Sequence, residues 1–295
     1  FGVDLSHTSR NYGHGMGKVD GDDYFRCDIG EFRQIENVIE YVKPDLVYNC
    51  AAEFGRWNGE HFYEKVWKSN VIGMKHIIRL QEKHGFKLVH CSSSEVYGDY
   101  EGIMYEDVLK QTPIIQMNDY AMSKRVNEMQ VHNSREQYGT ETVVVRFFNT
   151  YGPGENLNYL KKGMVSIYCS YVWRNKPIIV KGSLKRFRNH QYIDDVVNIL
   201  IKTISNKKLN KNEVFNLTTG KVTKVRELLN LIQRTAKKKL TIVESKGTEG
   251  DSFGYDASND YLKSKFNDVK FTSLEKGLKK YFDWINKLPK IKNLK

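Results

Sequence analysis

The feature that most constrains this chain is a serine-rich strand end, followed by a helix that carries a tyrosine and a lysine four positions apart. Residues 87–90 read as a short buried strand that leads into three serines, Ser92, Ser93 and Ser94. The segment from Tyr120 onward has a helical pattern, in which residues i and i+4 lie on one face. The side chains of Tyr120 and Lys124 are therefore expected to point the same way.

This spacing suits the oxidation of an alcohol. A phenol has an ordinary pKa of about 10 and is a poor base at neutral pH, but a nearby ammonium lowers that pKa. Lys124 is therefore expected to activate Tyr120, and a serine hydroxyl could bind the substrate oxygen whose proton moves. The hydride would go to an acceptor such as a nicotinamide. Tyrosine and lysine at this spacing also occur on solvated helix faces, but the serine-rich strand end favours the catalytic interpretation.

Four motifs stand out when the chain is taken as a whole. They are Ser-Ser-Ser-Glu-Val-Tyr-Gly from Ser92, Tyr-x-x-x-Lys from Tyr120, Arg-Phe-Phe-Asn-Thr-Tyr-Gly-Pro-Gly from Arg146, and Arg-x-x-x-Tyr-Ile-Asp-Asp from Arg188. In combination they resemble the extended short-chain dehydrogenases/reductases that act on nucleotide sugars. The resemblance runs from residue 1 to about residue 284, and it implies bound NAD and a nucleotide-diphosphate sugar as the substrate.

The resemblance also assigns catalytic residues. It places the family's catalytic serine at Ser93, and it gives Tyr120 and Lys124 roles both in catalysis and in holding NAD. Glu95 stands where the resembled 4,6-dehydratases hold a base. Nucleotide-sugar decarboxylases carry Ser-Glu at this place too, whereas simple 4-epimerases often do not, and a purely structural Glu95 is the alternative.

We therefore expect oxidation of the sugar 4-hydroxyl by hydride transfer to bound NAD, followed by dehydration or epimerisation. A nucleotide-sugar decarboxylase or 4-dehydrogenase of the same family is the alternative. A non-catalytic, nucleotide-binding regulatory protein is the alternative from another class. Such a protein would lose the Tyr120 and Lys124 pair, which this chain keeps.

Strands and helices alternate through residue 145, which predicts an α/β fold with a Rossmann-like, doubly wound parallel sheet. Asp4, near the end of the strand with which the given sequence opens, stands where this fold has the acid that binds the adenosine ribose, which favours NAD over NADP. Arg10 nevertheless leaves room for a 2′-phosphate. The resemblance implies four further cofactor contacts: Asp28 and Ile29 at the adenine, and Ala51 and Ala52 beside the nicotinamide-side ribose.

Six residues are expected to bind the substrate: Glu53, Ser94, Asn149, Arg186, Arg188 and Asp251. An arginine grips phosphate oxygens bidentately and stays charged at any relevant pH. The resemblance places Arg188 on the substrate phosphates, with Arg186 in support. It also implies that Asn149 contacts the sugar diphosphate and that Asp251 lies near the nucleotide ribose. Glu53 and Ser94 are expected to line the pocket.

The chain departs from the family pattern in three places. Asn189 stands where the family commonly has aspartate, and Thr248 stands where it usually has arginine, so the nucleotide base stays unassigned. The first strand and the glycine-rich turn that carries the cofactor pyrophosphate are missing before Phe1. We therefore expect roughly thirty residues of the first βα unit to be absent from this sequence. The glycines of residues 13–17 are interpreted as a loop.

Two domains are expected to interleave. Residues 1–155, with about 185–205 returning to them, would form the NAD-binding domain, and residues 156–184 and 206–295 the substrate-binding lobe. Residues 61–84 and 117–138 are predicted as long helices. The resemblance implies that these two helices from each subunit form the four-helix bundle of a homodimer. The alternative is that their apolar stripes belong only to the core.

Composition limits the remaining function classes. The net charge of +12 would suit nucleic acid, but the lysines are spread over the chain, so we expect no nucleic-acid partner. No apolar run approaches the length of a membrane span and nothing resembles a signal peptide, so we expect no membrane partner and a cytoplasmic protein. The four cysteines are expected to be separate buried thiols, without a metal site: Cys27, Cys50, Cys91 and Cys169.

Overall fold

The computed structural model describes residues 1–5, 23–55, 61–155, 157, 163–205, 212–247, 249–266 and 268–288. The predictions for Arg10, residues 13–17 and Thr248 lie outside these ranges. Among the described helices, none is both long enough and apolar enough to cross a membrane.

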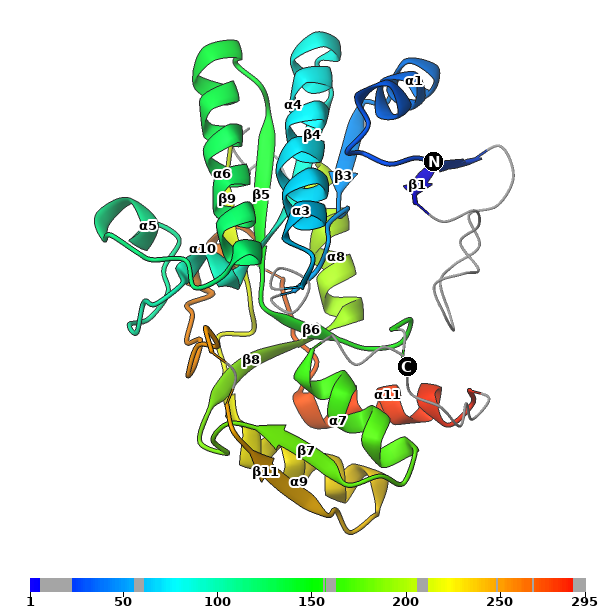
Figure 1. The fold of residues 1–295 in the computed structure, drawn as a ribbon, viewed down its shortest axis with the longest axis vertical. Coiled ribbons are helices and arrows are strands. Elements are labelled where there is room, and N and C mark those ends of the chain that lie inside the picture. The colour runs from blue at the N-terminus through cyan, green and yellow to red at the C-terminus, as the bar shows by residue number, and fades with distance from the viewer. Residues whose placement is uncertain are drawn as a thin grey trace.

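A four-stranded parallel sheet forms the centre of the upper half of the molecule (Figure 1). Its strands stand in the order β3 (Leu46–Asn49), β4 (Lys87–Ser93), β5 (Thr142–Phe147) and β9 (Val214–Leu217). A second parallel pair, β1 (Gly2–Asp4) and β2 (Tyr24–Arg26), forms a separate two-stranded sheet. The predicted Rossmann-like parallel architecture is confirmed, although the parallel strands divide into two sheets.

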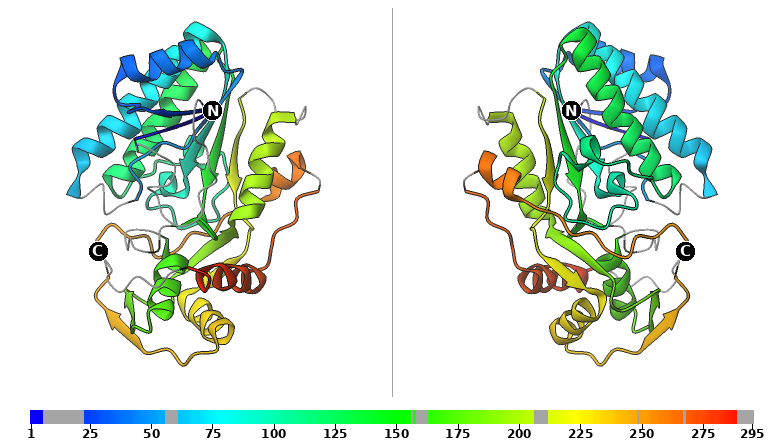
Figure 2. Two further views of the ribbon diagram at one scale, coloured as in Figure 1. Left: turned by 90° about the vertical axis from the view of Figure 1, so that its right-hand side faces the viewer. Right: turned by 90° about the vertical axis from the view of Figure 1, so that its left-hand side faces the viewer.

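Helices cover both faces of the central sheet (Figure 2). One face packs against α1 (Phe32–Val42), α4 (Gly73–His84) and α6 (Asp119–Tyr138), and the other packs against α8 (Ile193–Ser205) and α10 (Asp260–Lys265). Successive side chains of a strand point to opposite faces. Val144 accordingly joins the core of the first face, while Val143 and Val145 join the core of the second. This doubly covered sheet explains the unbroken valine run in β5.

Both predicted long helices are present, but the structure differs from a single regular helix in the first and starts the second two residues later. The predicted helix over residues 61–84 consists of α3 (Tyr63–Val66), a π-helical segment (Trp67–Ile72) and α4. The predicted helix over residues 117–138 is α6, and it begins after Asn118, whose side chain accepts a hydrogen bond from the Ala121 N–H at 2.9 Å. The 3-10 segment Ser94–Tyr97 and the short α5 (Val108–Gln111) lie between β4 and α6.

The lower half of Figure 1 holds a smaller mixed lobe. Its three-stranded sheet has the order β10 (Val222–Lys224), β8 (Phe187–Tyr192) and β6 (Asn149–Tyr151), and β7 (Ile178–Lys181) pairs with β11 (Ile242–Ser245). Of these strands, β6, β7 and β8 share an apolar core with three helices, α7 (Met164–Trp173), α9 (Val225–Ala236) and α11 (Leu274–Ile285). Thr223 pairs with Arg188 in the sheet, and α9 begins after Lys224.

Candidate active site

The end of β4 and the start of α6 bring the predicted catalytic residues together. Ser93 is the last residue of β4, three residues beyond the predicted end, because β4 continues to pair with β5 as far as Phe147. Tyr120 lies in the first turn of α6, is 5% exposed and forms a side-chain hydrogen bond with Ser93. The serine and the phenol therefore face each other at the carboxyl end of the central sheet.

Lys124 lies one helical turn beyond Tyr120, and it is 3% exposed. Its Nζ donates a hydrogen bond to the carbonyl oxygen of Cys91 at 2.8 Å and lies 5.8 Å from the centre of the Tyr120 ring. Burial lowers the pKa of Lys124 below its ordinary value. An ammonium has three N–H donors, and the described residues accept a hydrogen bond from only one of them. The remaining donors fit a ligand rich in hydroxyl oxygens, such as a ribose.

The expectation that Lys124 lowers the pKa of Tyr120 is wrong for this structure. Burial raises the pKa of the phenol, while the hydrogen bond with Ser93 lowers it and the nearby Glu95 carboxylate raises it further. The buried environment therefore outweighs the hydrogen bond. Tyr120 is protonated at neutral pH in the state described.

Glu95 lies in the 3-10 segment and borders both the phenol and the predicted phosphate site. Its backbone N–H donates to the Ser93 hydroxyl at 3.2 Å, and its carboxylate accepts a hydrogen bond from Asn118 at 3.5 Å and one from Tyr255. Burial raises the pKa of Glu95, and the charge of Arg188 opposes that effect. Sequence reasoning missed Tyr255 and Asn118, because the two residues meet Glu95 only in the folded chain.

The two predicted phosphate-binding arginines lie together at the start of β8. Arg186 and Arg188 are both buried, and both form ion pairs with Asp251, that of Arg188 at 3.0 Å. Arg188 also donates to the carbonyl oxygens of Ser252 and Phe253, and its guanidinium carbon lies 4.9 Å from the centre of the Tyr255 ring. One carboxylate thus holds two cations in place. The predicted contact of Asp251 with a ribose stays a prediction.

Two other predicted substrate-binding residues, Asn149 and Ser94, lie on different elements of the structure. Asn149 begins β6 opposite His190 of β8, and its side chain donates to the Asn189 carbonyl oxygen at 3.2 Å. Ser94 is 6% exposed in the 3-10 segment. Sequence reasoning missed His190, which is 6% exposed and has no hydrogen-bond partner on either ring nitrogen among the described residues. The sequence signal that could have identified His190 was an ionisable side chain within a buried strand.

The loop after β3 carries Ala51, Ala52 and Glu53, and it is fastened to α6 by Asn70. The Asn70 side chain accepts a hydrogen bond from the Glu53 N–H at 2.8 Å and donates to the Glu53 carbonyl oxygen at 3.2 Å. It also donates to the Ser123 hydroxyl at 2.9 Å. Asn70 lies in the π-helical segment, a kind of irregularity that is frequent at functional sites. Sequence reasoning missed it as the residue that positions this loop.

Of the predicted adenosine contacts, Asp4 is the last residue of β1, and Asp28 and Ile29 lie just beyond the end of β2. The Asp4 carbonyl oxygen accepts a hydrogen bond from Cys27. The Asp28 carboxylate accepts a hydrogen bond from the Gly30 N–H at 2.8 Å and lies 3.9 Å from the Lys68 ammonium. The Ile29 carbonyl oxygen lies 2.8 Å from His76 Nδ1. Both aspartates therefore stand at the carboxyl ends of parallel strands, where this type of fold holds nucleotides.

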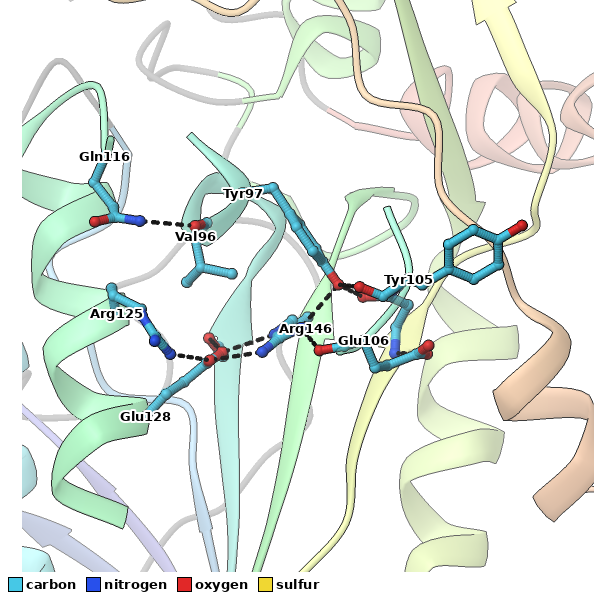
Figure 3. A network of polar contacts seen from close by, with 10 residues as sticks. Val96, Tyr97, Tyr105, Glu106, Gln116, Arg125, Glu128 and Arg146 are labelled. Carbon is cyan, nitrogen blue, oxygen red and sulfur yellow. Dashed lines mark hydrogen bonds and ion pairs between the residues drawn. The ribbon is translucent and has the colours of Figure 1, made fainter. Parts of the chain in front are cut away.

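A buried ion pair supports β4 and β5 beneath the site (Figure 3). Arg146 donates to both carboxylate oxygens of Glu128, at 2.9 and 2.8 Å, and to the Tyr97 hydroxyl at 2.8 Å. Ser92 donates to the same carboxylate at 2.7 Å. Glu128 and Arg146 also border a cavity of about 1010 Å³ between α6, β5 and β9. A hollow of about 490 Å³ lies away from the catalytic residues, beside Val172 and Leu240.

The cysteines differ from the prediction in one respect. All four are free thiols, and Cys27, Cys91 and Cys169 are buried as expected. Cys50 is exposed, and its Sγ lies 3.4 Å from the Sγ of Cys91. The prediction that all four cysteines are separate and buried is therefore wrong for Cys50.

Known proteins share both the sequence pattern and the fold. UDP-glucuronate 4-epimerase of Thermodesulfobacterium geofontis is 26% identical over 281 residues, which cover 88% of this chain and 78% of that protein. UDP-glucuronic acid decarboxylase 1 of Xenopus tropicalis is 31% identical over 163 residues, which cover 55% of this chain and 38% of that protein.

The crystal structure of UDP-glucose 4-epimerase from Thermotoga maritima with UDP-glucose superimposes with a TM-score of 0.84 at 24% identity, over 97% of this chain and 90% of that one. This likeness shows the fold. A model of the NAD-dependent epimerase/dehydratase family matches residues 2–218. Because that match spans well over half of the chain, the protein belongs to the NAD-dependent epimerase/dehydratase family, and its cofactor is NAD.

Proposed function

We propose that this protein oxidises the 4-hydroxyl of a nucleotide-diphosphate sugar and then dehydrates or epimerises the resulting ketone. The observation that carries the proposal is the meeting of Ser93, Tyr120 and Lys124 at the carboxyl end of β4, with Glu95 and the arginine pair next to them. Together, a hydroxyl, a phenol and an ammonium can bind an alcohol oxygen and move its proton, which a reversible alcohol oxidation needs.

Each catalytic residue has a separate task. NAD, when bound, supplies the acceptor for the hydride. The Ser93 hydroxyl binds the sugar oxygen, and Tyr120 moves the proton of that oxygen, since the two side chains share a hydrogen bond. Lys124 holds ribose hydroxyls with its remaining N–H donors while the Cys91 carbonyl oxygen fixes its position. The raised pKa of Tyr120 suits the step that returns a proton to the ketone, whereas the oxidation step requires the phenolate.

Glu95 supports dehydration over plain epimerisation. A 4-keto group acidifies the neighbouring C–H, and a carboxylate within reach can remove that proton. Glu95 has the two properties such a base needs: a pKa raised by burial, and hydrogen bonds from Asn118 and Tyr255 that fix its orientation. The likeness to a decarboxylase keeps decarboxylation as the second candidate, because loss of CO₂ also follows 4-oxidation.

The substrate phosphates would lie on Arg186 and Arg188, which present buried guanidinium groups near Glu95. Asn149, Ser94, Glu53 and Asp251 would complete the pocket around the sugar and nucleotide. Asp4, Asp28, Ile29, Ala51 and Ala52 would contact NAD along the strand ends. We propose that residues 1–155 and about 185–205 bind NAD and that residues 156–184 and 206–295 bind the substrate.

The direct test incubates the full-length protein with UDP-, GDP-, CDP- and dTDP-sugars and determines product masses. Loss of water identifies a dehydratase, loss of carbon dioxide a decarboxylase, and unchanged mass with altered stereochemistry an epimerase. Net formation of NADH with a 4-keto product identifies a 4-dehydrogenase. If no sugar is converted and bound NAD is never reduced, the protein is a nucleotide-binding regulator and the proposal fails.

We further propose a cytoplasmic homodimer that assembles through α4 and α6. The two helices pack side by side. Exposed apolar side chains lie on α6 (Met122 and Met129), on α3 (Tyr63) and on the π-helical segment (Ile72). Light scattering after size-exclusion chromatography should give twice the mass of one chain. Replacing both Met122 and Met129 with lysine should yield monomers, and an unchanged dimer would place the interface elsewhere.

A further inference from the structure

We propose that Cys50 is a modification site for peroxides, and that Cys91 is the thiol that resolves the modified Cys50 into a disulfide beside Lys124. Neither thiol has a part in the proposed reaction. The thiol chemistry stands independently of that reaction, while its effect on turnover rests on the proposed function.

The geometry of two neighbouring strands brings the thiols together. Cys50 directly follows Asn49, the last residue of β3, and Asn49 pairs with His90 of β4. The parallel register therefore places Cys50 next to Cys91, and the two Sγ atoms lie 3.4 Å apart. Cα atoms of adjacent strands lie about 4.8 Å apart, within the range of about 4.4–6.8 Å that a disulfide bridges. The sulfur atoms need to close only from 3.4 Å to roughly 2.0 Å.

The two thiols have different exposure and acidity. Cys50 is exposed, whereas Cys91 is buried. The hydrogen bond between them lowers the pKa of Cys50 and raises that of Cys91. At Cys50, partial burial of the thiol opposes this lowering, and the Lys124 ammonium adds to it. The thiolate is the reactive form of cysteine, so Cys50 is the site of first attack. Cys27 has a pKa raised to about 11 by burial, and both it and Cys169 are buried controls within the same chain.

The chemistry balances with a peroxide as the oxidant. The Cys50 thiolate attacks one oxygen of hydrogen peroxide, the O–O bond breaks, and a sulfenic acid forms as hydroxide leaves. Cys91 then attacks the Cys50 sulfur, the S–O bond breaks, and hydroxide leaves and takes up the Cys91 proton as water. Two thiols lose two electrons in total, and one peroxide is reduced to two waters.

The disulfide would act on the site through the backbone. The Cys91 carbonyl oxygen holds the Lys124 ammonium at 2.8 Å, and Cys50 immediately precedes Ala51 and Ala52. Drawing the end of β3 against β4 would shift both the lysine and the strand end that is proposed to contact NAD. We expect turnover of the oxidised protein to fall at least tenfold and to return on addition of dithiothreitol.

The test treats the purified full-length protein with hydrogen peroxide, alkylates the remaining thiols and sequences the peptides by mass spectrometry. The proposal requires that the peptides containing Cys50 and Cys91 are cross-linked and are lighter by two hydrogens than the reduced pair. It also requires that Cys27 and Cys169 are alkylated. In Cys91→Ser, the sulfenic acid at Cys50 should be trapped by dimedone. In Cys50→Ser, Cys91 should stay reduced and turnover should survive peroxide.

Equal oxidation of all four cysteines, or a Cys50→Ser variant that loses turnover to peroxide as fast as the parent, would overturn the proposal. A thermal unfolding scan of each variant shows whether the protein is folded. The disulfide is detected from the mass of the cross-linked peptides, whereas the sugar reaction is detected from its products. A cross-link in a protein that converts no sugar would therefore refute the proposed function alone.

Discussion

Replacing Arg146 with methionine would leave the Glu128 carboxylate buried without its main cation. Arg146 is 3% exposed and Glu128 is 7% exposed, and the arginine donates to both carboxylate oxygens, to the Tyr97 hydroxyl and to the Glu106 carbonyl oxygen. Removing one partner of a buried ion pair costs roughly 3–5 kcal/mol. At about 2–4 °C per kcal/mol, the unfolding midpoint should fall by about 6–20 °C.

Differential scanning calorimetry measures this fall, and a surface pair supplies the matched control. Arg33 forms an ion pair with Glu36 at 2.6 Å, but the arginine side chain is 84% exposed, and the 12% exposed Glu36 keeps a second cation, Lys83, at 3.7 Å. Arg33→Met should therefore shift the midpoint by no more than about 1–2 °C, as expected for a surface ion pair. The double variant Glu128→Leu/Arg146→Met removes both charges, so it should be more stable than Arg146→Met alone. An Arg146→Met midpoint within the range of the surface control would refute the reasoning.

Four further outcomes follow from the site. Tyr120→Phe should lower turnover by roughly two to four orders of magnitude while calorimetric affinity for the nucleotide sugar changes little; turnover at the parent rate would contradict its role. Because burial raises the pKa of Tyr120, the rate of the oxidation step should increase as the pH rises from 7 to 9. Single-turnover reduction of bound NAD measures this rate, and a rate that does not change with pH would exclude the phenol as the base. Arg188→Met should weaken nucleotide-sugar binding by roughly 10- to 150-fold, because a hydrogen bond to a charged group is lost. NAD binding serves as the control and should not change. His190→Phe removes two ring nitrogens that have no partner among the described residues, so in the absence of substrate it should stabilise the fold by roughly 1–3 kcal/mol. A lowered unfolding midpoint would show that the imidazole has a structural partner.

The features that could be predicted from the sequence are those that depend on residues close together in the chain. Residues i and i+4 of a helix share a face whatever the rest of the chain does, so the shared orientation of Tyr120 and Lys124 could be read from their spacing. The alternation of strands and helices through residue 145 likewise predicted a parallel sheet, and β3, β4 and β5 pair in parallel. Serines lack the apolar pattern of a buried strand, so the extension of β4 to Ser93 became visible only through its pairing with β5.

The features that were missed or misjudged arise from tertiary contacts. The lowered pKa expected for Tyr120 considered only Lys124, whereas burial by the whole site decides its direction. Cys50 and Cys91 are 41 positions apart, and only the register of β3 with β4 makes them neighbours. Asn70 fastens the loop after β3 from within a π-helical segment, which no helical periodicity indicates.

The shared carboxylate of Asp251 has a consequence for which ligands this protein can retain. Two guanidinium groups already converge on one anion, so the pair carries a single surplus positive charge. A monoanionic headgroup would do no more than match that surplus, whereas a pyrophosphate link brings a second negative charge that can compete with Asp251 for the guanidinium N–H groups. The cluster should thus favour sugars that are linked to the nucleoside through a pyrophosphate, which carries two negative charges, over sugars that are linked through a single phosphodiester, which carries one.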